Sequence, residues 1–248
     1  MFLKPSGMPY YRFLSALHET CLFDWYLEVG CRAGKSFAPV RSKTIAVDPF
    51  FQAEANIIGK KPALHVFQQA SDDFFASGFL ARNGIRLGLA FLDGMHLFEF
   101  LLRDFINTEA AMAPGGVILL HDCVPSGTGM TTRDLDNLPK RAWTGDVWKL
   151  IPILQAWRPD LQVTVLDCQP TGLVAIGGLD PENRVLAANY ERIVGDFSDM
   201  TIAAFGVERF FASFQMASGR DERRAGFPLF RAASLAFDRA LEPRAVTP

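Results

Sequence analysis

A short apolar run leads into a glycine-rich turn in the segment Tyr26-Leu27-Glu28-Val29-Gly30-Cys31-Arg32-Ala33-Gly34-Lys35-Ser36. The apolar run predicts a buried strand, and the turn is expected to lead into a helix. Gly30 and Gly34 lack the side chains that would hold a ligand away from the backbone, and the start of a helix offers unpaired N–H groups. The segment therefore predicts a ligand-binding turn at the end of a strand.

The sequence on either side repeats this alternation of strand and helix. Helical spacing is found at residues 9–21, about 97–112 and 147–157, and Pro114-Gly115-Gly116 is a predicted helix stop. Further apolar runs at 44–48, 63–67, 87–93 and 116–121 predict buried strands of a parallel sheet covered on both faces. Residues 161–168 and 172–177, joined by a short turn, predict an antiparallel pair at the sheet edge.

Composition narrows the class of protein. The chain has 248 residues, 49% of them hydrophobic, and a net charge of −2, which suits an α/β domain with a full core. Clustered Lys and Arg for phosphate contacts are missing, so no nucleic-acid partner is expected. No apolar run approaches the roughly 18 residues of a membrane span. Four scattered cysteines without a CxxC pair argue against a zinc site and favour a reducing, cytoplasmic location.

The glycine turn allows three kinds of ligand. A phosphate-binding P-loop ending at Gly34-Lys35-Ser36 would need glycine where Val29 stands. A dinucleotide fingerprint would need its second glycine at Arg32, whose side chain would obstruct a pyrophosphate. S-adenosylmethionine has a cationic sulfonium instead of a phosphate, and the carboxylate of Glu28 suits it. Asp48, about 20 residues further on at the end of the next strand, is expected to hold the ribose hydroxyls. The remaining alternative is a plain strand–helix turn whose glycines serve packing.

These motifs, taken in order, resemble those of class I S-adenosylmethionine-dependent methyltransferases, in the branch whose glycine motif reads E-x-G-x-R-x-G-x-S. Phe91-Leu92-Asp93-Gly94-Met95-His96 resembles that branch's F-I-D-G-D-H motif. The run from Pro114 to Asp122 resembles its P-G-G strand, and Thr171–Ile176 its last strand. The resemblance covers residues 9–178. It implies a Rossmann-like, doubly wound α/β fold with a seven-stranded sheet, an antiparallel final strand and three α/β/α layers. Met95 departs from the branch, where an acidic residue is usual, and this weakens a metal role for that loop.

The resemblance also implies roles for individual residues of the cofactor site. Glu28, Gly30 and Gly34 would shape the methionine end of S-adenosylmethionine, with Ser36 contacting it. Asp48 would bind the ribose, and Ser71 and Asp72 would lie near the adenine. Asp93 would lie close to the methyl donor.

Four side chains are expected to meet at the strand ends and to carry the chemistry: Asp93, His96, His121 and Asp122. In one hypothesis Asp93, His121 and Asp122 hold a divalent cation, by analogy with metal-dependent O-methyltransferases; the imidazole suits Mn²⁺ or Fe²⁺ better than Mg²⁺. In the other, His121 or His96 is a general base oriented by a carboxylate. Plain capping by the two aspartates is the structural alternative. We interpret His18 and His65 as structural, and Lys35 and Arg103 as exposed.

The remaining sequence yields expectations about organisation and partners. Residues 1–180 are expected to form the cofactor-binding domain, and residues 181–248 a C-terminal helical extension of the same domain. The long loop 124–146 and the helices after residue 181 are expected to hold a small hydroxylated acceptor, a sugar or natural product. Trp148 is expected in the core, whereas Trp143 could line the acceptor site. The phenylalanine-rich stretch 205–214 suggests a homodimer. A non-catalytic module that binds the cofactor is the alternative to an enzyme.

Overall fold

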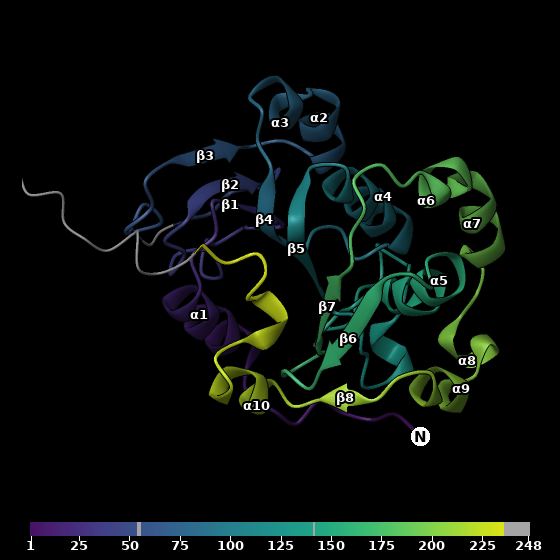
Figure 1. The fold of residues 1–248 in the computed structure, drawn as a ribbon. Coiled ribbons are helices and arrows are strands. Elements are labelled where there is room, and N and C mark those ends of the chain that lie inside the picture. The colour runs from purple at the N-terminus through teal and green to yellow at the C-terminus, as the bar shows by residue number, and fades with distance from the viewer. Residues whose placement is uncertain (54–55, 141, 236–248) are drawn as a thin grey trace, which may run out of the picture.

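A single mixed sheet forms the centre of the computed structural model, which describes residues 1–53, 56–140 and 142–235. Its strands follow the order β3-β2-β1-β4-β5-β7-β6-β8 (Figure 1). Strands β1 to β5 are parallel, whereas β7 is antiparallel to both of its neighbours. The bounds are β1 (Trp25–Val29), β2 (Lys43–Val47), β3 (Leu64–Phe67), β4 (Leu87–Leu92), β5 (Met112–His121), β6 (Gln162–Leu166), β7 (Leu173–Gly177) and β8 (Met216–Ala217).

This topology confirms the predicted doubly wound sheet with an antiparallel strand, with one correction. The sheet of the described residues has eight strands instead of the expected seven, because the short strand β8 pairs with Val165 and Leu166 of β6. The antiparallel β6–β7 pair therefore does not form the edge of the sheet. Inside the sheet, the strand order reverses at β1, which lies between β2 and β4. The carboxyl ends of these three strands therefore border the switch point, where doubly wound sheets bind ligands.

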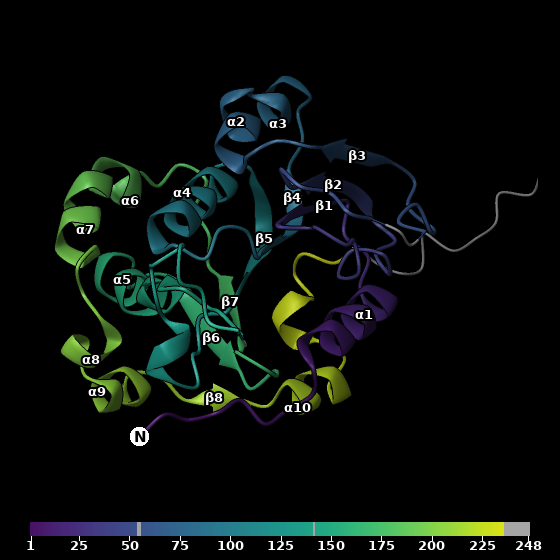
Figure 2. The same cartoon turned by 180° about the vertical axis from the view of Figure 1, so that it is seen from behind.

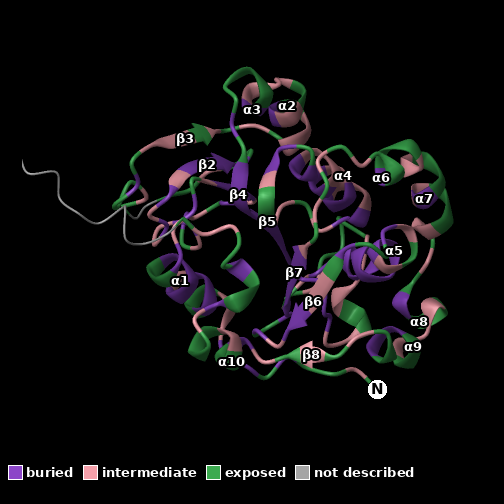
Figure 3. Cartoon of the chain, in the orientation of Figure 1, coloured by how far each residue is buried: buried purple, intermediate pink, exposed green. Residues whose placement is uncertain are grey.

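Helices cover both faces of the sheet and give the predicted three layers (Figures 1 and 2). Alternate residues of β1 enter different cores: Leu27 and Val29 pack toward α4 and α5, whereas Tyr26 packs with Phe13 of α1. Buried residues concentrate in the strands and on the inner sides of the helices (Figure 3). The helices are α1 (Tyr10–Thr20), α2 (Ser71–Ala76), α3 (Phe79–Arg82), α4 (Phe98–Glu109), α5 (Leu150–Trp157), α6 (Val185–Ala188), α7 (Tyr190–Phe197), α8 (Ile202–Phe205), α9 (Val207–Ala212) and α10 (Gly219–Arg224).

Two local predictions were wrong. The glycine turn leads into successive turns over residues 31–40 instead of a helix. Gly34 has a φ of +75°, outside the helical region, and Pro39 has no N–H to donate to a helix. The predicted helix stop at 114–116 lies inside β5, because α4 already ends at Glu109. Residues 113–116 form an irregularity between the Leu87–Met112 and Leu89–Val117 pairs.

The C-terminal segment packs back onto the domain. Phe210 is fully buried, and its ring centroid lies 5.4 Å from that of Trp148, as expected for a Trp148 in the core. The phenylalanine-rich stretch thus packs internally and gives no reason to expect a dimer. Further on, Phe227 and Phe230 pack around Phe13 of α1. Figures 1 and 2 show this C-terminal segment beside α1. The end of the predicted extension, residues 236–248, lies outside the described residues.

The N-terminal segment is hydrogen-bonded to the residues that follow β6. Gly7 donates a backbone hydrogen bond of 2.8 Å to the carbonyl of Asp167, and Pro9 forms a β-bridge with Gln169. These contacts fix the start of α1 beside the turn between β6 and β7. Within the described part of the chain, no helix combines the length and the apolar character needed to cross a membrane.

Candidate active site

A cavity of about 1570 Å³ lies at the carboxyl ends of β1, β2 and β4. It is lined by the glycine turn, the segments that follow β2 and β4, and the start of α2. Seven of the residues predicted from the sequence line it: Gly30, Ser36, Asp48, Ser71, Asp72, Asp93 and His96. The lining does not include four other predicted residues: Glu28, Gly34, His121 and Asp122. These residues therefore act by supporting the side chains and backbone that do line the cavity.

Asp48 lies directly against the glycine turn. The pairing of Val29 with Val47 carries it there, since Asp48 follows β2 as Gly30 follows β1. Its Oδ2 accepts a hydrogen bond of 2.7 Å from the backbone N–H of Arg32, and its Oδ1 accepts one of 2.7 Å from Phe50. The carboxylate therefore shapes the turn and also faces the cavity. Arg32 has a φ of +30°, a conformation that this contact supports.

Glu28 lies buried underneath the turn instead of lining the cavity. Its carboxyl accepts hydrogen bonds from the hydroxyl of Tyr26, at 2.5 Å, and from the hydroxyl of Ser36. Burial raises the pKa of Glu28 to about 7, although both hydroxyl donors oppose the shift. Ser36 does reach the cavity, so Glu28 acts on the turn through Ser36.

The two glycines of the turn are required for different reasons. Gly30 has a φ of +90°, and a Cβ there would overlap the carbonyl oxygen of Asp93. Gly30 thus allows the ends of β1 and β4 to approach each other. A Cβ at Gly34 would lie 2.6 Å from a side-chain carbon of Ile57, so this glycine serves packing of the turn.

Ser71 and Asp72 begin α2 and form the wall at the end of β3. Arg103 of α4 binds Asp72 through two hydrogen bonds of 2.9 and 2.7 Å, and its guanidinium also donates to the hydroxyl of Tyr190. The prediction that Arg103 is exposed was therefore wrong. Its side chain is 30% exposed and fixes the position of Asp72.

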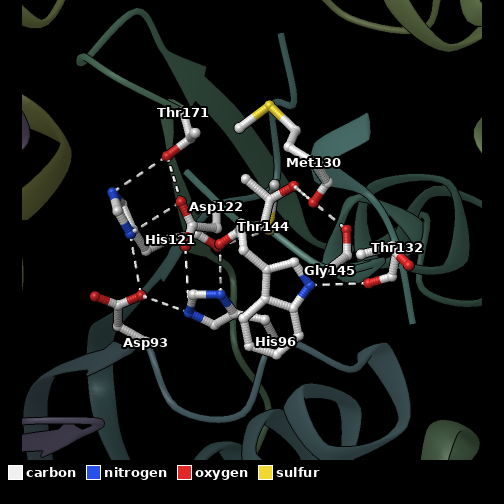
Figure 4. Close-up of polar contacts among 11 residues, drawn as sticks. Asp93, His96, His121, Asp122, Met130, Thr132, Thr144, Gly145 and Thr171 are labelled. Atoms are coloured by element: carbon white, nitrogen blue, oxygen red, sulfur yellow. Dashed lines mark hydrogen bonds and ion pairs between the residues drawn. The ribbon is translucent and has the colours of Figure 1, made fainter. Parts of the chain in front are cut away.

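The four predicted catalytic side chains do meet, as Figure 4 shows. His121 Nδ1 lies 3.0 Å from Asp93 Oδ1 and 3.4 Å from Asp122 Oδ1. Burial alone would lower the pKa of His121, but the charges of Asp93 and Asp122 outweigh it and raise this pKa to about 10. A His121 that keeps its proton donates to the carboxylates, and it is poorly suited to be a base or a metal ligand. Asp122 itself has a φ of +59° and accepts a hydrogen bond of 2.5 Å from Thr171.

His96 is oriented by a backbone carbonyl. Its Nδ1 lies 2.8 Å from the carbonyl oxygen of Trp143, which can only accept a hydrogen bond, so Nδ1 carries the hydrogen. Nε2 then points toward two carboxylates, 3.3 Å from Asp122 Oδ2 and 3.7 Å from Asp93 Oδ1. Carboxylates offer no donor, so this arrangement calls for a proton or a cation between Nε2 and the two aspartates.

Within residues 1–53, 56–140 and 142–235, one group could hold a metal ion: Asp93, His96 and Asp122, whose ligand atoms lie within 4.8 Å of one another. The group differs from the predicted set in having His96 where the sequence suggested His121. The reason is geometric, since His121 lies behind the two carboxylates with both ring nitrogens directed at protein groups.

Five aromatic residues line the cavity, and the sequence pointed only to Trp143; the others are Tyr10, Tyr11, Phe50 and Phe100. Trp143, left open by the sequence, lines the cavity, with its ring centroid 4.9 Å from that of His96. Tyr10 and Tyr11 of α1 also line it, and the Tyr10 ring lies 4.1 Å from the ring of His121. Helical spacing at residues 9–21 predicted this helix, but no signal in the sequence linked it to the strand ends.

Comparison with known proteins agrees with this geometry. Residues 25–123 match a family model described as a methyltransferase domain. The fold is similar to that of the O-methyltransferase TomG of Streptomyces achromogenes, involved in tomaymycin synthesis and solved with S-adenosylmethionine (SAM). Identity is 17%, coverage is 68% of this chain and 78% of TomG, and the TM-score is 0.51.

Two further similar structures are more distant. An O-methyltransferase from Bacillus cereus, solved with S-adenosylhomocysteine (SAH), is 14% identical over 69% of this chain and 80% of its own, with a TM-score of 0.46. The mycinamycin methyltransferase MycE, solved with Mg and SAH, is 14% identical over 70% of this chain and 49% of its own, with a TM-score of 0.44. No curated protein matches the sequence.

The fold is similar to that of the methyltransferase TomG, and residues 25–123, less than half of the chain, match the model of a methyltransferase domain. The likeness to TomG is a likeness of fold, and the two proteins differ at most positions.

Proposed function

We propose that this chain is a SAM-dependent O-methyltransferase that acts on a small hydroxylated acceptor. One observation carries the proposal: the Asp48 carboxylate and the glycine turn share a single cavity with Asp93 and His96. TomG, which has a similar fold, was solved in complex with SAM. The neighbouring positions of Asp48 and the turn provide carboxylate oxygens and bare backbone for the adenosine and methionine ends of that cofactor.

The residues that line the cavity fit SAM as a cofactor. Its volume of about 1570 Å³ exceeds the roughly 300–1,000 Å³ of an ordinary ligand pocket, so a cofactor and an acceptor can lie in it together. Gly30, Ser36 and Asp48 would hold the methionine and ribose ends, with Ser71 and Asp72 near the adenine. When bound, SAM supplies an activated methyl group, which leaves the protein to align the acceptor and remove its proton.

The acceptor is expected between the tyrosines of α1 and the long loop. Tyr10, Tyr11, Met95 and Trp143 give this part of the cavity flat, largely apolar walls, which suit a ring-containing acceptor. His96 is the titratable imidazole that faces the cavity, and its Nε2 is directed toward the end of β4. If no metal is bound, we assign the acceptor's hydroxyl proton to Nε2 of the neutral form of His96, and Asp93 and Asp122 would stabilise the imidazolium that results.

A divalent cation fits the donor set of the site. Asp93, His96 and Asp122 would hold it, and it would polarise the acceptor hydroxyl so that the proton leaves more readily. Two carboxylate oxygens and one imidazole suit Mn²⁺ or Fe²⁺ better than Mg²⁺. The cation would also supply the positive charge that the facing Nε2 and carboxylates call for.

Replacing His96 by alanine should weaken Mn²⁺ binding, measured by calorimetry, at least tenfold, because one of three protein ligands is lost. His65→Ala is the matched control, since His65 stacks on Trp25 in the sheet and lies away from the cavity. Equal Mn²⁺ affinity in the two variants would contradict the metal assignment. Methyl transfer that survives chelator treatment would leave His96 as a base without a metal.

Calorimetry with SAH, NAD and ATP tests the function itself. We expect SAH to bind and the two phosphate-bearing ligands not to, because the turn lacks the glycine spacing that a phosphate chain needs. Transfer of labelled methyl groups from SAM to a panel of phenols, catechols and glycosides then tests for catalysis. Binding of SAH without transfer to any acceptor would favour the non-catalytic module, and binding of ATP or NAD alone would end the proposal.

The proposed function also implies which partners and which cellular location this chain has. The acceptor is a small molecule, and neither a nucleic acid nor a membrane is expected as a partner. The four cysteines are free and buried, which suits the reducing cytoplasm. A homodimer stays a prediction, now without support from the phenylalanine-rich stretch.

A further inference from the structure

The long loop between β5 and α5 is joined to α4 by one arginine. Arg133 donates two hydrogen bonds to the carboxylate of Glu99, of 2.9 and 2.6 Å, in the first turn of α4. The same guanidinium donates a third, of 2.6 Å, to Asp146 at the other end of the loop. Arg133 thus links the first part of the loop, around residue 133, and its last part, around Asp146, to α4, the helix that begins two residues after His96.

Asp146 extends this connection to the backbone of His96. Its side chain is 3% exposed, and it accepts a hydrogen bond of 2.6 Å from the fully buried Lys149. Its other carboxylate oxygen accepts one of 2.9 Å from the N–H of Phe98, in the first turn of α4. The N–H of Asp146 donates to the carbonyl of His96 at 3.2 Å. Two cations and two carboxylates therefore meet here with their charges balanced.

Trp143, at the same end of the loop as Asp146, holds the side chain of His96. The indole N–H of Trp143 donates a hydrogen bond of 2.8 Å to the carbonyl of Thr132, the residue before Arg133. The carbonyl of Trp143 in turn accepts the hydrogen bond from His96 Nδ1. Figure 4 shows His96 between this end of the loop and the aspartates. The loop consequently fixes His96 through two hydrogen bonds, one from its ring to Trp143 and one from Asp146 to its backbone carbonyl.

We infer that Arg133 is a positioning residue, which keeps the loop closed on α4 so that His96 Nε2 points toward Asp93 and Asp122. Arg133 does not line the cavity and so has no direct contact with a ligand there. A bidentate contact between guanidinium and carboxylate fixes geometry as well as charge, which lysine cannot reproduce. The inference rests on the proposed function for its meaning, but its test requires neither an acceptor nor turnover.

The ¹⁵N NMR spectrum of the imidazoles tests this role, since the chain has only four histidines. In the SAH-loaded protein we expect a protected hydrogen on His96 Nδ1. In Arg133→Met this signal should be lost or averaged with exchange, while His18 and His65 keep their signals and the Kd for SAH stays within twofold. Arg133→Lys should restore part of the His96 signal. Arg224→Met is the matched control, because that arginine is 80% exposed and its ion pair among the described residues is with Asp221, away from the loop.

An unchanged His96 signal in folded Arg133→Met would overturn the inference. If that variant does not fold, Glu99→Gln carries the same test, because it removes the carboxylate from the bidentate contact and leaves Asp146 paired with Lys149. An unchanged His96 signal in folded Glu99→Gln is then the decisive contrary result. Failure of the wild-type protein to bind SAH would count against the proposed function and not against the positioning role, so the two outcomes are distinguishable.

Discussion

Replacing Asp48 by alanine should weaken SAH binding by roughly a hundredfold, measured by calorimetry. Hydrogen bonds to charged groups contribute about 1.5–3 kcal/mol each, and every 1.4 kcal/mol is about tenfold in Kd. The substitution removes the acceptor for the N–H groups of Arg32 and Phe50, and with it the carboxylate intended for the ribose. The turn would lose its shape and its ligand together.

Asp136→Ala is the control for loss of a carboxylate, because Asp136 is exposed and does not line the cavity. Its affinity for SAH should equal that of the wild type. Asp48→Asn should fall between the two, since the amide oxygen can still accept one of the hydrogen bonds. If Asp48→Ala binds SAH as tightly as the control, the assignment of Asp48 to the cofactor fails.

Replacing Gly30 by alanine should lower the free energy of unfolding by about 2–5 kcal/mol, measured by urea denaturation. Of this, about 1–2 kcal/mol comes from the left-handed backbone conformation, and about 1–3 kcal/mol from overpacking. The new Cβ would overlap the carbonyl oxygen of Asp93, which belongs to the backbone and cannot turn aside. The ends of β1 and β4 would be forced apart, and SAH binding should be lost as well.

Gly78→Ala separates the two contributions. Gly78 also has a positive φ, +66°, but a Cβ there would have nothing within 4 Å. It should therefore show only the conformational cost of about 1–2 kcal/mol. Equal losses in the two variants would mean that the close approach of β1 and β4 contributes nothing to stability.

The sheet, and the residues that line the cavity beside the glycine turn, could be predicted because their signals are local. Buried parallel strands form continuous apolar runs in the sequence, and Asp48 and Asp93 directly follow the strands β2 and β4. Parallel strands bring their carboxyl ends to one edge, so residues far apart in sequence could be assigned to one site. The pattern also predicted the antiparallel pairing of β6 with β7.

The features that sequence could not supply depend on contacts between distant segments. Glu28 reads as a ligand carboxylate, but its burial and its bond with Ser36 become visible only in three dimensions. The different roles of His121 and His96 depend on which carbonyls and carboxylates surround each ring. Strand β8, with only two residues, is too short to give a periodic signal and pairs because the C-terminal segment passes beside β6.

The anchoring of the N-terminal segment near Asp167 and Gln169 has a consequence for the order in which the two halves of the cavity can mature. The cofactor half draws on residues 29–72 and the segment after β4, which leave the ribosome early and close together. Tyr10 and Tyr11, which form the tyrosine wall of the cavity, are synthesised still earlier. The residues that anchor their helix, Asp167 and Gln169, are synthesised much later. In a nascent chain, the half of the cavity proposed for the cofactor can therefore form before the tyrosine wall is anchored, because that anchoring requires residues from the last third of the polypeptide.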